Sequence, residues 1–422
     1  MSFIKKAGKN WRIIENVVFV LAFGYITCKL IANYWRYVYD SLKWKGYLGT
    51  IINPISTHEY YKSAVAIMVA LNATFVLWEI LLLITRLWKQ ERGNTNTYQK
   101  YKLIFKNLLV NYKPSFLALL VIELLPKLIL IHVVWLWLPH IQKIGVFTIN
   151  LKWYSWIYAY VCWELATWIF HFSCHRVRFL WCLHCQHHSP SELNMTVNWV
   201  HFFAESYYST FVHLVILALL GVPPVMLLVI MSISSAWGIF THVSEGALKN
   251  GKLGPLQHLL VTPSHHRVHH AKNPLYVDTN FATVVPLWDW IFGTLQPLKK
   301  EVETDCGITR DLDVTNFSDL YFGEILLLYR DVKNAAGIKN KLLYIVMPPG
   351  WTPVSSAETA VAIRRDFLRA NPGLDETSRH RLLTAFKSCF KWNRPQVNDA
   401  SVFAETCTDG QVTIIEHEMQ PN

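Results

Sequence analysis

Charged residues are scarce in this chain of 422 residues. They make up 16% of the sequence, whereas a soluble globular domain carries about 25%. The formal net charge is nevertheless +11, but the basic residues flank apolar stretches and form no basic domain, which argues against a nucleic-acid partner. A hydrophobic content of 52% indicates instead an integral membrane protein whose basic loops face anionic lipid.

A disulfide framework and an internal repeat are also missing from the sequence. The eight cysteines are scattered along the chain, so the pattern is not that of a small disulfide-stapled domain. Transporters often carry repeated halves, and none is visible here. The sequence also contains no haem-binding or flavin-binding motif, so a redox reaction would need electrons from an outside donor.

The sequence does contain long apolar stretches. They cover residues 17–32, 64–84, 116–138, 153–170, 203–220 and 225–240. The last two are short for a hydrocarbon layer about 30 Å thick, and Gly221 and Pro223 mark a turn between them. We therefore expect an all-α transmembrane helix bundle in which these two stretches form a hairpin.

The basic residues orient this bundle. Those at 5–12 and 86–113 place the N-terminus and the first returning loop in the cytosol. Counting crossings from there brings every later histidine-rich segment to the same cytosolic face. We expect N-terminal transmembrane helices (1–145), a histidine-rich domain (146–300) and a small soluble C-terminal extension (301–422). Within the extension, helices are expected at 320–335, 358–370 and 376–390, and a strand at 410–418.

Histidines are concentrated in one part of the chain and repeat one spacing. Thirteen of the 18 lie between residues 171 and 270. Three boxes stand out: His171 and His175, then His184, His187 and His188, and then His266, His269 and His270. On a helix, residues i, i+3 and i+4 share one face, and imidazole binds iron, zinc or copper. The boxes together predict a helical cap that holds two metal ions at the membrane face.

Other residues near the boxes are weaker candidates. His265 and His201 are possible metal ligands or neighbours of ligands. Cys182 and Cys185 overlap the second box, so a zinc site made of two cysteines and two histidines is an alternative. It is disfavoured because the segment is expected to be helical and no second separated pair follows.

The third box lies in a longer motif. Residues 262–270 read TPSHHRVHH, and Trp288-Asp289 and 292–294 (FGT) follow. This pattern resembles the fatty acid hydroxylase/sterol desaturase superfamily over about residues 150–297. Its nearest branches are the alkylglycerol monooxygenase-like proteins and the bacterial sterol desaturase proteins. The chain departs from the family pattern at Phe172 and at Trp168-Ile169, and these departures leave the spacing of the boxes intact.

The resemblance implies a set of site residues. The metal ligands would be His171, His175, His184, His187, His188, His242, His266, His269 and His270, with His242 matching a lone ligand of the family. Residues expected to support them by hydrogen bonds are Glu164, Asn194, Asp278, Asn280 and Asp289. Glu164 lies two helical turns before His171, so we expect its carboxylate to bond a ligand imidazole.

The resemblance also implies an activity. A membrane di-iron oxygenase would use O₂ to hydroxylate or desaturate a C–H bond of a lipid drawn from the bilayer. An alkylglycerol-type ether lipid with tetrahydrobiopterin as reductant is one reading. A sterol desaturase, C-4 methyl oxidase or fatty-acyl hydroxylase with a cytochrome b5-type or ferredoxin-type donor is another. The membrane would be the endoplasmic reticulum in a eukaryote or the inner membrane in a bacterium. A non-catalytic membrane metal-binding protein is the alternative from a different class.

Overall fold

The computed structural model describes most of the C-terminal two thirds of the chain. The described residues are 152–374 apart from 311, 314 and 315, together with 11, 13–25, 28, 74, 77–82, 84–85, 102, 106, 109, 111–124, 143, 145, 147 and 149–150. Within them the regular structure is helical, and pairing between extended segments is limited to two isolated bridges. The expected all-α fold is therefore confirmed for the described residues.

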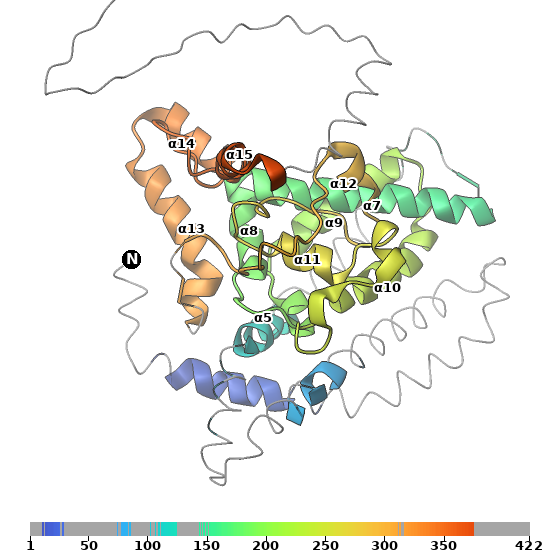
Figure 1. The fold of residues 1–422 in the computed structure, drawn as a ribbon, viewed down its shortest axis with the longest axis horizontal. Coiled ribbons are helices and arrows are strands. Elements are labelled where there is room, and N and C mark those ends of the chain that lie inside the picture. Colours follow the sequence, from blue (N-terminus) through green and yellow to red (C-terminus); the bar gives the residue numbers. More distant parts are fainter. Residues whose placement is uncertain are drawn as a thin grey trace, which may run out of the picture. The chain divides into compact units, whose positions relative to one another are not determined.

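The helices follow one another in the order shown in Figure 1. The α-helices are α5 (Lys113–Leu124), α7 (Trp153–Arg176), α8 (Arg178–His188), α9 (Glu205–Leu219), α10 (Pro224–Thr241), α11 (Pro263–His269), α12 (Leu287–Phe292), α13 (Phe317–Asn334), α14 (Gly337–Val346) and α15 (Ala360–Ala370). Short 3-10 helices are η3 (Met195–Trp199), η4 (Lys249–Gly251), η5 (Gly254–His258) and η6 (Pro372–Leu374).

The predicted hairpin is present as α9 and α10. Gly221 lies in the turn between them with a φ of 67°, a left-handed conformation that glycine adopts without steric cost. A Cβ atom at this position would lie 2.5 Å from the carbonyl oxygen of Phe147. The turn therefore requires glycine for two separate reasons, and a larger residue would push α9 and α10 out of place.

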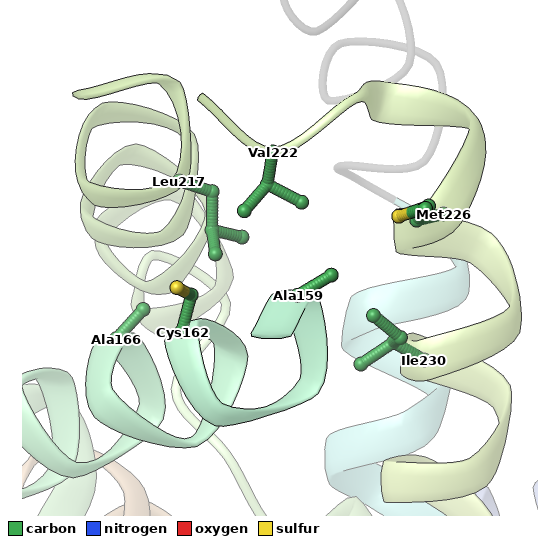
Figure 2. Packing of buried hydrophobic residues seen from close by; sticks show 7 residues of the cluster. All are labelled: Ala159, Cys162, Ala166, Leu217, Val222, Met226 and Ile230. Carbon is green, nitrogen blue, oxygen red and sulfur yellow. The ribbon is translucent and has the colours of Figure 1, made fainter. Parts of the chain in front are cut away.

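Small side chains on α7 let the hairpin approach closely. Figure 2 shows the buried cluster formed by Ala159, Cys162 and Ala166 of α7, Leu217 of α9, Val222 of the turn, and Met226 and Ile230 of α10. Ala159 and Ala166 are fully buried, so a longer side chain at either position would overpack the cluster. This packing fixes the first part of α7, the end of α9 and the start of α10 relative to one another, whereas His171 and His175 lie in the last turns of α7 and His242 directly follows the end of α10.

Three of the predicted membrane crossings coincide with helices, but these helices do not meet the criteria for a membrane span. Helices occupy 153–170, 203–220 and 225–240 for most of their length, as α7, α9 and α10. Among the described residues, however, none of the helices combines the length and the apolar character that one membrane crossing requires. Large parts of the expected crossings at 17–32, 64–84 and 116–138 lie outside the described residues.

Residues beyond 300 pack directly onto the histidine-bearing helix α8. Two of the expected helices are present as α13 and α15, and α14 is an addition that the sequence had not indicated. Arg178 of α8 forms an ion pair with Asp331 of α13 at 2.6 Å, and its backbone N–H donates to the carbonyl of Met347 at 3.1 Å. The helix expected at 376–390 and the strand at 410–418 lie outside the described residues.

Candidate metal centre

Nine histidines gather into two adjacent buried sets. His171, His175, His184, His188 and His269 form one set, called here the five-histidine set. His187, His242, His266 and His270 form the other, called here the four-histidine set. Within each set the ligand nitrogens lie within 4.8 Å of one another. These nine are the residues that the resemblance nominates as ligands.

The second and third boxes each serve both sets. In α8, His184 and His188 belong to the five-histidine set and His187 to the four-histidine set. In the third box, His266 and His270 join the four-histidine set while His269 joins the other. At 3.6 residues per turn, positions i and i+4 lie about 40° apart around the axis and i+3 lies about 100° from i+4. A box of this form therefore points at two neighbouring centres, although its three positions lie on one broad face of the helix as the spacing predicted.

Backbone carbonyls determine which ring nitrogen carries the proton in three of the imidazoles. The Nδ1 atoms of His171, His269 and His242 lie 2.8, 2.7 and 2.6 Å from the carbonyl oxygens of Phe281, Thr279 and Gly238. A carbonyl oxygen only accepts hydrogen bonds, so each Nδ1 carries the proton. In a neutral imidazole the lone pair is then on Nε2, the atom that faces the centre of its set.

The facing Nε2 atoms have the spacing of ligands around an ion. In the five-histidine set, the Nε2 atom of His188 lies 3.2 Å from those of His175 and His184. In the other set, the Nε2 atom of His242 lies 3.2 Å from that of His187, and the Nε2 atom of His266 lies 3.1 Å from that of His270 and, more closely, 2.8 Å from that of His242. Two ligands that are each about 2.1 Å from one metal ion lie about 3.0–3.4 Å apart. Converging lone pairs repel unless a cation lies between them, so the residues present fit two metal ions.

Among the described residues, carboxylates bond directly to imidazoles of one of the two sets. Glu205 accepts from Nδ1 of His184 at 2.7 Å, and Asp278 accepts from Nδ1 of His175 at 3.1 Å while pairing with Arg176 at 3.2 Å. Both imidazoles belong to the five-histidine set. Among the described residues, Nδ1 of His187 and of His270 in the other set has no hydrogen-bond partner.

Burial keeps the imidazoles in the form that binds metals. Desolvation lowers the pKa of His242 and of His269 to about 3, and it lowers the pKa of His187 and His188 well below the usual value. These rings are therefore neutral at pH 7, as metal ligation requires. Burial also raises the pKa of Asp278 to about 6, against the lowering effect of Arg176.

His201 belongs to neither main set. It forms a third group with His184 and Glu205, in which Nδ1 of His201 lies 2.7 Å from the second carboxylate oxygen. Contacts of 2.7 Å suit hydrogen bonds better than two ligands on one ion, so we interpret this group as a hydrogen-bonded support. The His201 ring also stacks on His187 at 4.4 Å and 13°. Glu205 and His201 thereby link the two sets.

His265 also lies outside both sets. Its Nδ1 accepts from the backbone N–H of Thr262 at 3.2 Å and so caps the start of α11. Consecutive helical residues are rotated by about 100°, so His265 points away when His266 points inward. The two cysteines of the second box, Cys182 and Cys185, are buried and belong to no candidate ligand group in the described residues, which removes the support for the zinc alternative.

The expected role of Glu164 is wrong. Its carboxylate accepts from the backbone N–H groups of Val284 and Val285 at 3.2 and 3.3 Å, and not from an imidazole. Seven residues along a helix correspond to about 10 Å, too far for the carboxylate to reach the ring of His171. Glu164 instead anchors the loop that follows the third box.

Two of the other support residues act through the backbone, and one lies away from the histidines. Asp289 accepts from the N–H groups of Phe281 and Ala282 at 2.9 and 2.8 Å, which holds the carbonyl that His171 uses. Asn280 donates to the carbonyl of His265 at 3.0 Å. Asn194 caps η3 by accepting from Thr196 at 3.0 Å, and it bonds no histidine. Asp278, beside His175, is the support residue that touches an imidazole directly.

Sequence reasoning missed Glu205 and the backbone carbonyls. Glu205 had a signal in the sequence, because His201 and Glu205 are four residues apart and i, i+4 pairs meet on a helix. The carbonyls of Thr279 and Phe281 had none. They are oriented by a loop in which Asp278 and Asn280 have φ values of 56° and 58°, and such a conformation cannot be read from residue types.

Comparisons with known proteins agree with the sequence resemblance. Residues 156–294 match the fatty acid hydroxylase family. The chain is 30% identical over 208 residues to alkylglycerol monooxygenase of Xenopus tropicalis, and 30% identical over 207 residues to that of Homo sapiens. It is 29% identical over 146 residues to the ornithine lipid hydroxylase OlsE of Rhizobium tropici.

These matches cover only part of each protein. The two alkylglycerol monooxygenase matches span 49% and 48% of this chain and 45% of each relative. The match to the bacterial enzyme spans 35% of this chain and 43% of the relative. The chain therefore spans less than half the length of these relatives. No solved structure gives a significant match.

Proposed function

We propose that this protein, whose residues 156–294 match the fatty acid hydroxylase family, is a di-iron oxygenase that oxidises a C–H bond of a lipid. The observation that carries the proposal is the pair of buried histidine sets with converging Nε2 atoms. The names of the relatives, alkylglycerol monooxygenase and ornithine lipid hydroxylase, support a lipid as the substrate class.

The proposed reaction uses one O₂ and two electrons from outside the chain. Hydroxylation converts R–H, O₂, two electrons and two protons into R–OH and water. Desaturation converts –CH₂–CH₂– with the same O₂, electrons and protons into –CH=CH– and two waters. Two bound irons would supply the oxidising chemistry. The chain itself fixes the ligand rings through Glu205, Asp278 and the carbonyl of Phe281, and it excludes water by burying the imidazoles.

The electron donor follows from the substrate branch. An alkylglycerol-type ether lipid would go with tetrahydrobiopterin, and a sterol or fatty-acyl substrate with a cytochrome b5-type or ferredoxin-type protein. We propose that the donor is external in either case, because the sequence holds no haem-binding or flavin-binding motif. The chemistry of imidazole ligands is the same in each branch, so the metal centre does not favour one of them.

The proposed setting is a membrane with the metal centre at its cytosolic face. The first box lies at the end of α7 and His242 lies directly after α10, so both are placed at helix ends, where a lipid from the bilayer would arrive. The basic residues at 5–12 and 86–113 support the cytosolic side. The endoplasmic reticulum of a eukaryote or the inner membrane of a bacterium is the corresponding location.

Metal content and product formation test the proposal together. Iron-loaded protein in lipid nanodiscs should hold about two irons per chain and should incorporate one atom of ¹⁸O₂ into lipid or form a double bond when reductant is added. His269→Ala should lose both properties. His258→Ala is the matched control, since His258 is exposed and belongs to neither set. A protein that binds two metals without oxidising any lipid would be the non-catalytic metal-binding alternative.

A further inference from the structure

A row of apolar side chains is exposed along α13. Phe322, Leu326 and Tyr329 are all exposed, Tyr329 to 64%. Their spacing of four and three residues places them on one face of the helix. The buried residues of α13 lie on the other side, where the helix packs on α8. Exposed apolar side chains that adjoin one another, rather than being scattered, indicate a contact surface for another molecule.

Helix α14 repeats this pattern. Ile338, Leu342 and Val346 are exposed and follow one another at intervals of four residues, so they too share one face of their helix. The helix packs beside α13. Both helices lie beyond the family match, which ends at residue 294. The two rows, called here the outer stripes, therefore belong to a part of the chain that the match does not cover.

The acidic side chains of the two helices are paired with arginines elsewhere in the chain. Asp319 and Glu324 contact Arg310 at 3.2 and 2.7 Å, and Asp331 contacts Arg178 at 2.6 Å. These three are the acidic residues of α13, and α14 has none. The negative charge of the two helices is therefore balanced inside the protein.

The basic side chains of the same helices border the outer stripes. Lys333 continues the α13 stripe by four residues, Arg330 is exposed beside it, and Lys339 and Lys341 lie on either side of the α14 stripe. Within the described residues, the one ion pair of these four cations is a 3.8 Å contact between Arg330 and Asp331, which is already paired. The outer stripes thus carry a border of positive charge.

The start of α13 lies beside the first expected membrane crossing. The carboxylate of Glu15 accepts from the backbone N–H groups of Phe317 and Ser318 at 3.2 and 3.4 Å. Trp11 donates through Nε1 to the hydroxyl of Ser318 at 3.0 Å. The crossing expected at 17–32 begins two residues after Glu15, which is about 3 Å along a helix. The first turn of α13 therefore lies close to the cytosolic boundary of the proposed membrane.

The end of α13 lies near the same boundary. Asp331 pairs with Arg178, which comes two residues after the end of α7. Helix α7 extends six residues past the crossing expected at 153–170, which is about 9 Å. Helix α13 has 18 residues and is about 27 Å long. A helix of that length with both ends near one plane runs along the plane, as an interfacial helix does.

Charge and geometry disfavour the other occupants of the outer stripes. A second copy of the chain would bring the same cations against these, and lysine is depleted at protein interfaces. Residues 397–422 hold five acidic residues and no lysine or arginine, so they match the charge. They do not account for a helix that runs along the membrane boundary, whereas an anionic lipid surface matches both the charge and the plane.

We propose that the outer stripes of α13 and α14 rest on the anionic, cytosolic leaflet of the membrane that holds the chain. Their apolar side chains would enter the boundary between headgroups and acyl chains, while Arg330, Lys333 and Lys339 contact lipid phosphates. The proposal rests on the membrane setting of the proposed function and not on the reaction. Because α13 packs on α8, this contact ties the second histidine box to the lipid surface.

Depth measurements on the full-length, zinc-loaded protein in lipid nanodiscs test this surface. The fluorescent amino acid Anap replaces Leu326 or Leu342, or the control Val354, which is exposed in a loop outside both helices. The discs contain phosphatidylcholine, with or without phosphatidylserine. With phosphatidylserine present, brominated acyl chains should quench the probes at 326 and 342 at least about twofold and should leave the probe at 354 nearly unquenched.

A pair of charge reversals provides a matched control. The double variant Lys333→Glu, Lys339→Glu reverses two exposed charges beside the stripes, so quenching with phosphatidylserine should fall to the value in phosphatidylcholine alone. The double variant Arg365→Glu, Arg369→Glu changes the net charge equally at exposed positions of α15, and quenching should stay as in the unmodified protein. Zinc content shows that each variant is folded at the metal centre.

The remaining outcomes overturn the proposal. Quenching at 326 and 342 that does not exceed quenching at 354, or that does not rise with phosphatidylserine, removes the lipid surface. Probes that lipid bromine does not quench, and that iodide reaches only in a variant ending at residue 396, assign the stripes to residues 397–422. Probes that are protected from iodide only with two chains per disc assign them to a second copy.

Lipid oxidation by iron-loaded protein is measured on the same samples. Activity without quenching keeps the proposed function and removes the lipid surface. Quenching without activity keeps the surface and removes the proposed function.

Discussion

Glu205 and His184 are joined by a 2.7 Å hydrogen bond between Oε1 and Nδ1, inside the protein where Glu205 is only 3% exposed. The other carboxylate oxygen holds His201, which stacks on His187. One carboxylate thus orients an imidazole of the five-histidine set directly and touches the four-histidine set through an intermediate ring. This arrangement makes Glu205 a positioning residue for the metal centre.

Glu205→Gln should weaken metal binding about 10–100-fold, the usual effect of removing a hydrogen-bond partner behind a ligand histidine. The measurement is zinc affinity by chelator competition, together with the d–d spectrum of the cobalt-loaded protein. Glu192→Gln is the control, because Glu192 is exposed. Unchanged affinity and an unchanged cobalt spectrum in Glu205→Gln would show that this hydrogen bond does not position the ligand.

Asp278→Asn should have a similar but smaller effect. Asp278 accepts from His175 at 3.1 Å, a longer hydrogen bond than the one between Glu205 and His184, and Arg176 already offsets part of its negative charge. Replacing its carboxylate by an amide should therefore cost less metal affinity. Asparagine tolerates the left-handed backbone at this position, where φ is 56°, so the loop should keep its shape. The same zinc competition assay measures the effect. An affinity loss larger than that of Glu205→Gln would reverse the proposed order of the two carboxylates.

Acid should destabilise the metal-free protein. Burial lowers the folded-state pKa of His242 and of His269 to about 3, while the unfolded chain titrates near 6.5. Their contribution to stability is therefore complete above about pH 6.5 and is lost progressively as the pH falls towards 3, at about 2 kcal/mol for each residue by pH 5. Thermal unfolding of the apo protein between pH 8 and pH 5 measures this, and a constant melting temperature would contradict it.

A glycosylation test of the orientation in the membrane needs a sequon on an exposed loop. Two of the natural sequons begin at Asn194 and Asn316, but both side chains are buried and act as helix caps, so their glycosylation does not report the side of the membrane. Val354 is 94% exposed, and Val354→Asn creates a sequon with Ser356. For a cytosolic loop we expect no endoglycosidase-sensitive mass shift beyond that of the unmodified protein in eukaryotic cells. A shift would place this loop in the lumen and overturn the proposed topology.

The histidine sets were predictable to the extent that they depend on local spacing. The i, i+3, i+4 patterns at 184–188 and 266–270 are properties of a helix, and both segments are helical as α8 and α11. Gly221 and Pro223 likewise indicated the turn between α9 and α10. Each of these features is fixed within a few residues of the chain.

Contacts between distant segments could not be derived in this way. The carboxylate of Glu164 accepts a hydrogen bond from the backbone N–H of Val284, because the rise of the helix keeps it too far from His171. Only the folded loop shows where this partner lies. A cavity lies between Trp181 and His188 of α8 and residues beyond 300 such as Leu327, and no residue pattern in either segment indicates that the two meet. Long-range packing, and the loop conformation at 278–280, are the parts that the sequence leaves open.

The interleaving of the two sets along α8 and α11 restricts how this centre can change. His184 and His188 serve one set while His187 serves the other, so a rotation of α8 that improves one ligand geometry displaces the other. The third box imposes the same constraint, because His269 serves one set while His266 and His270 serve the other. A movement of either helix therefore changes the ligand geometry of both sets at once.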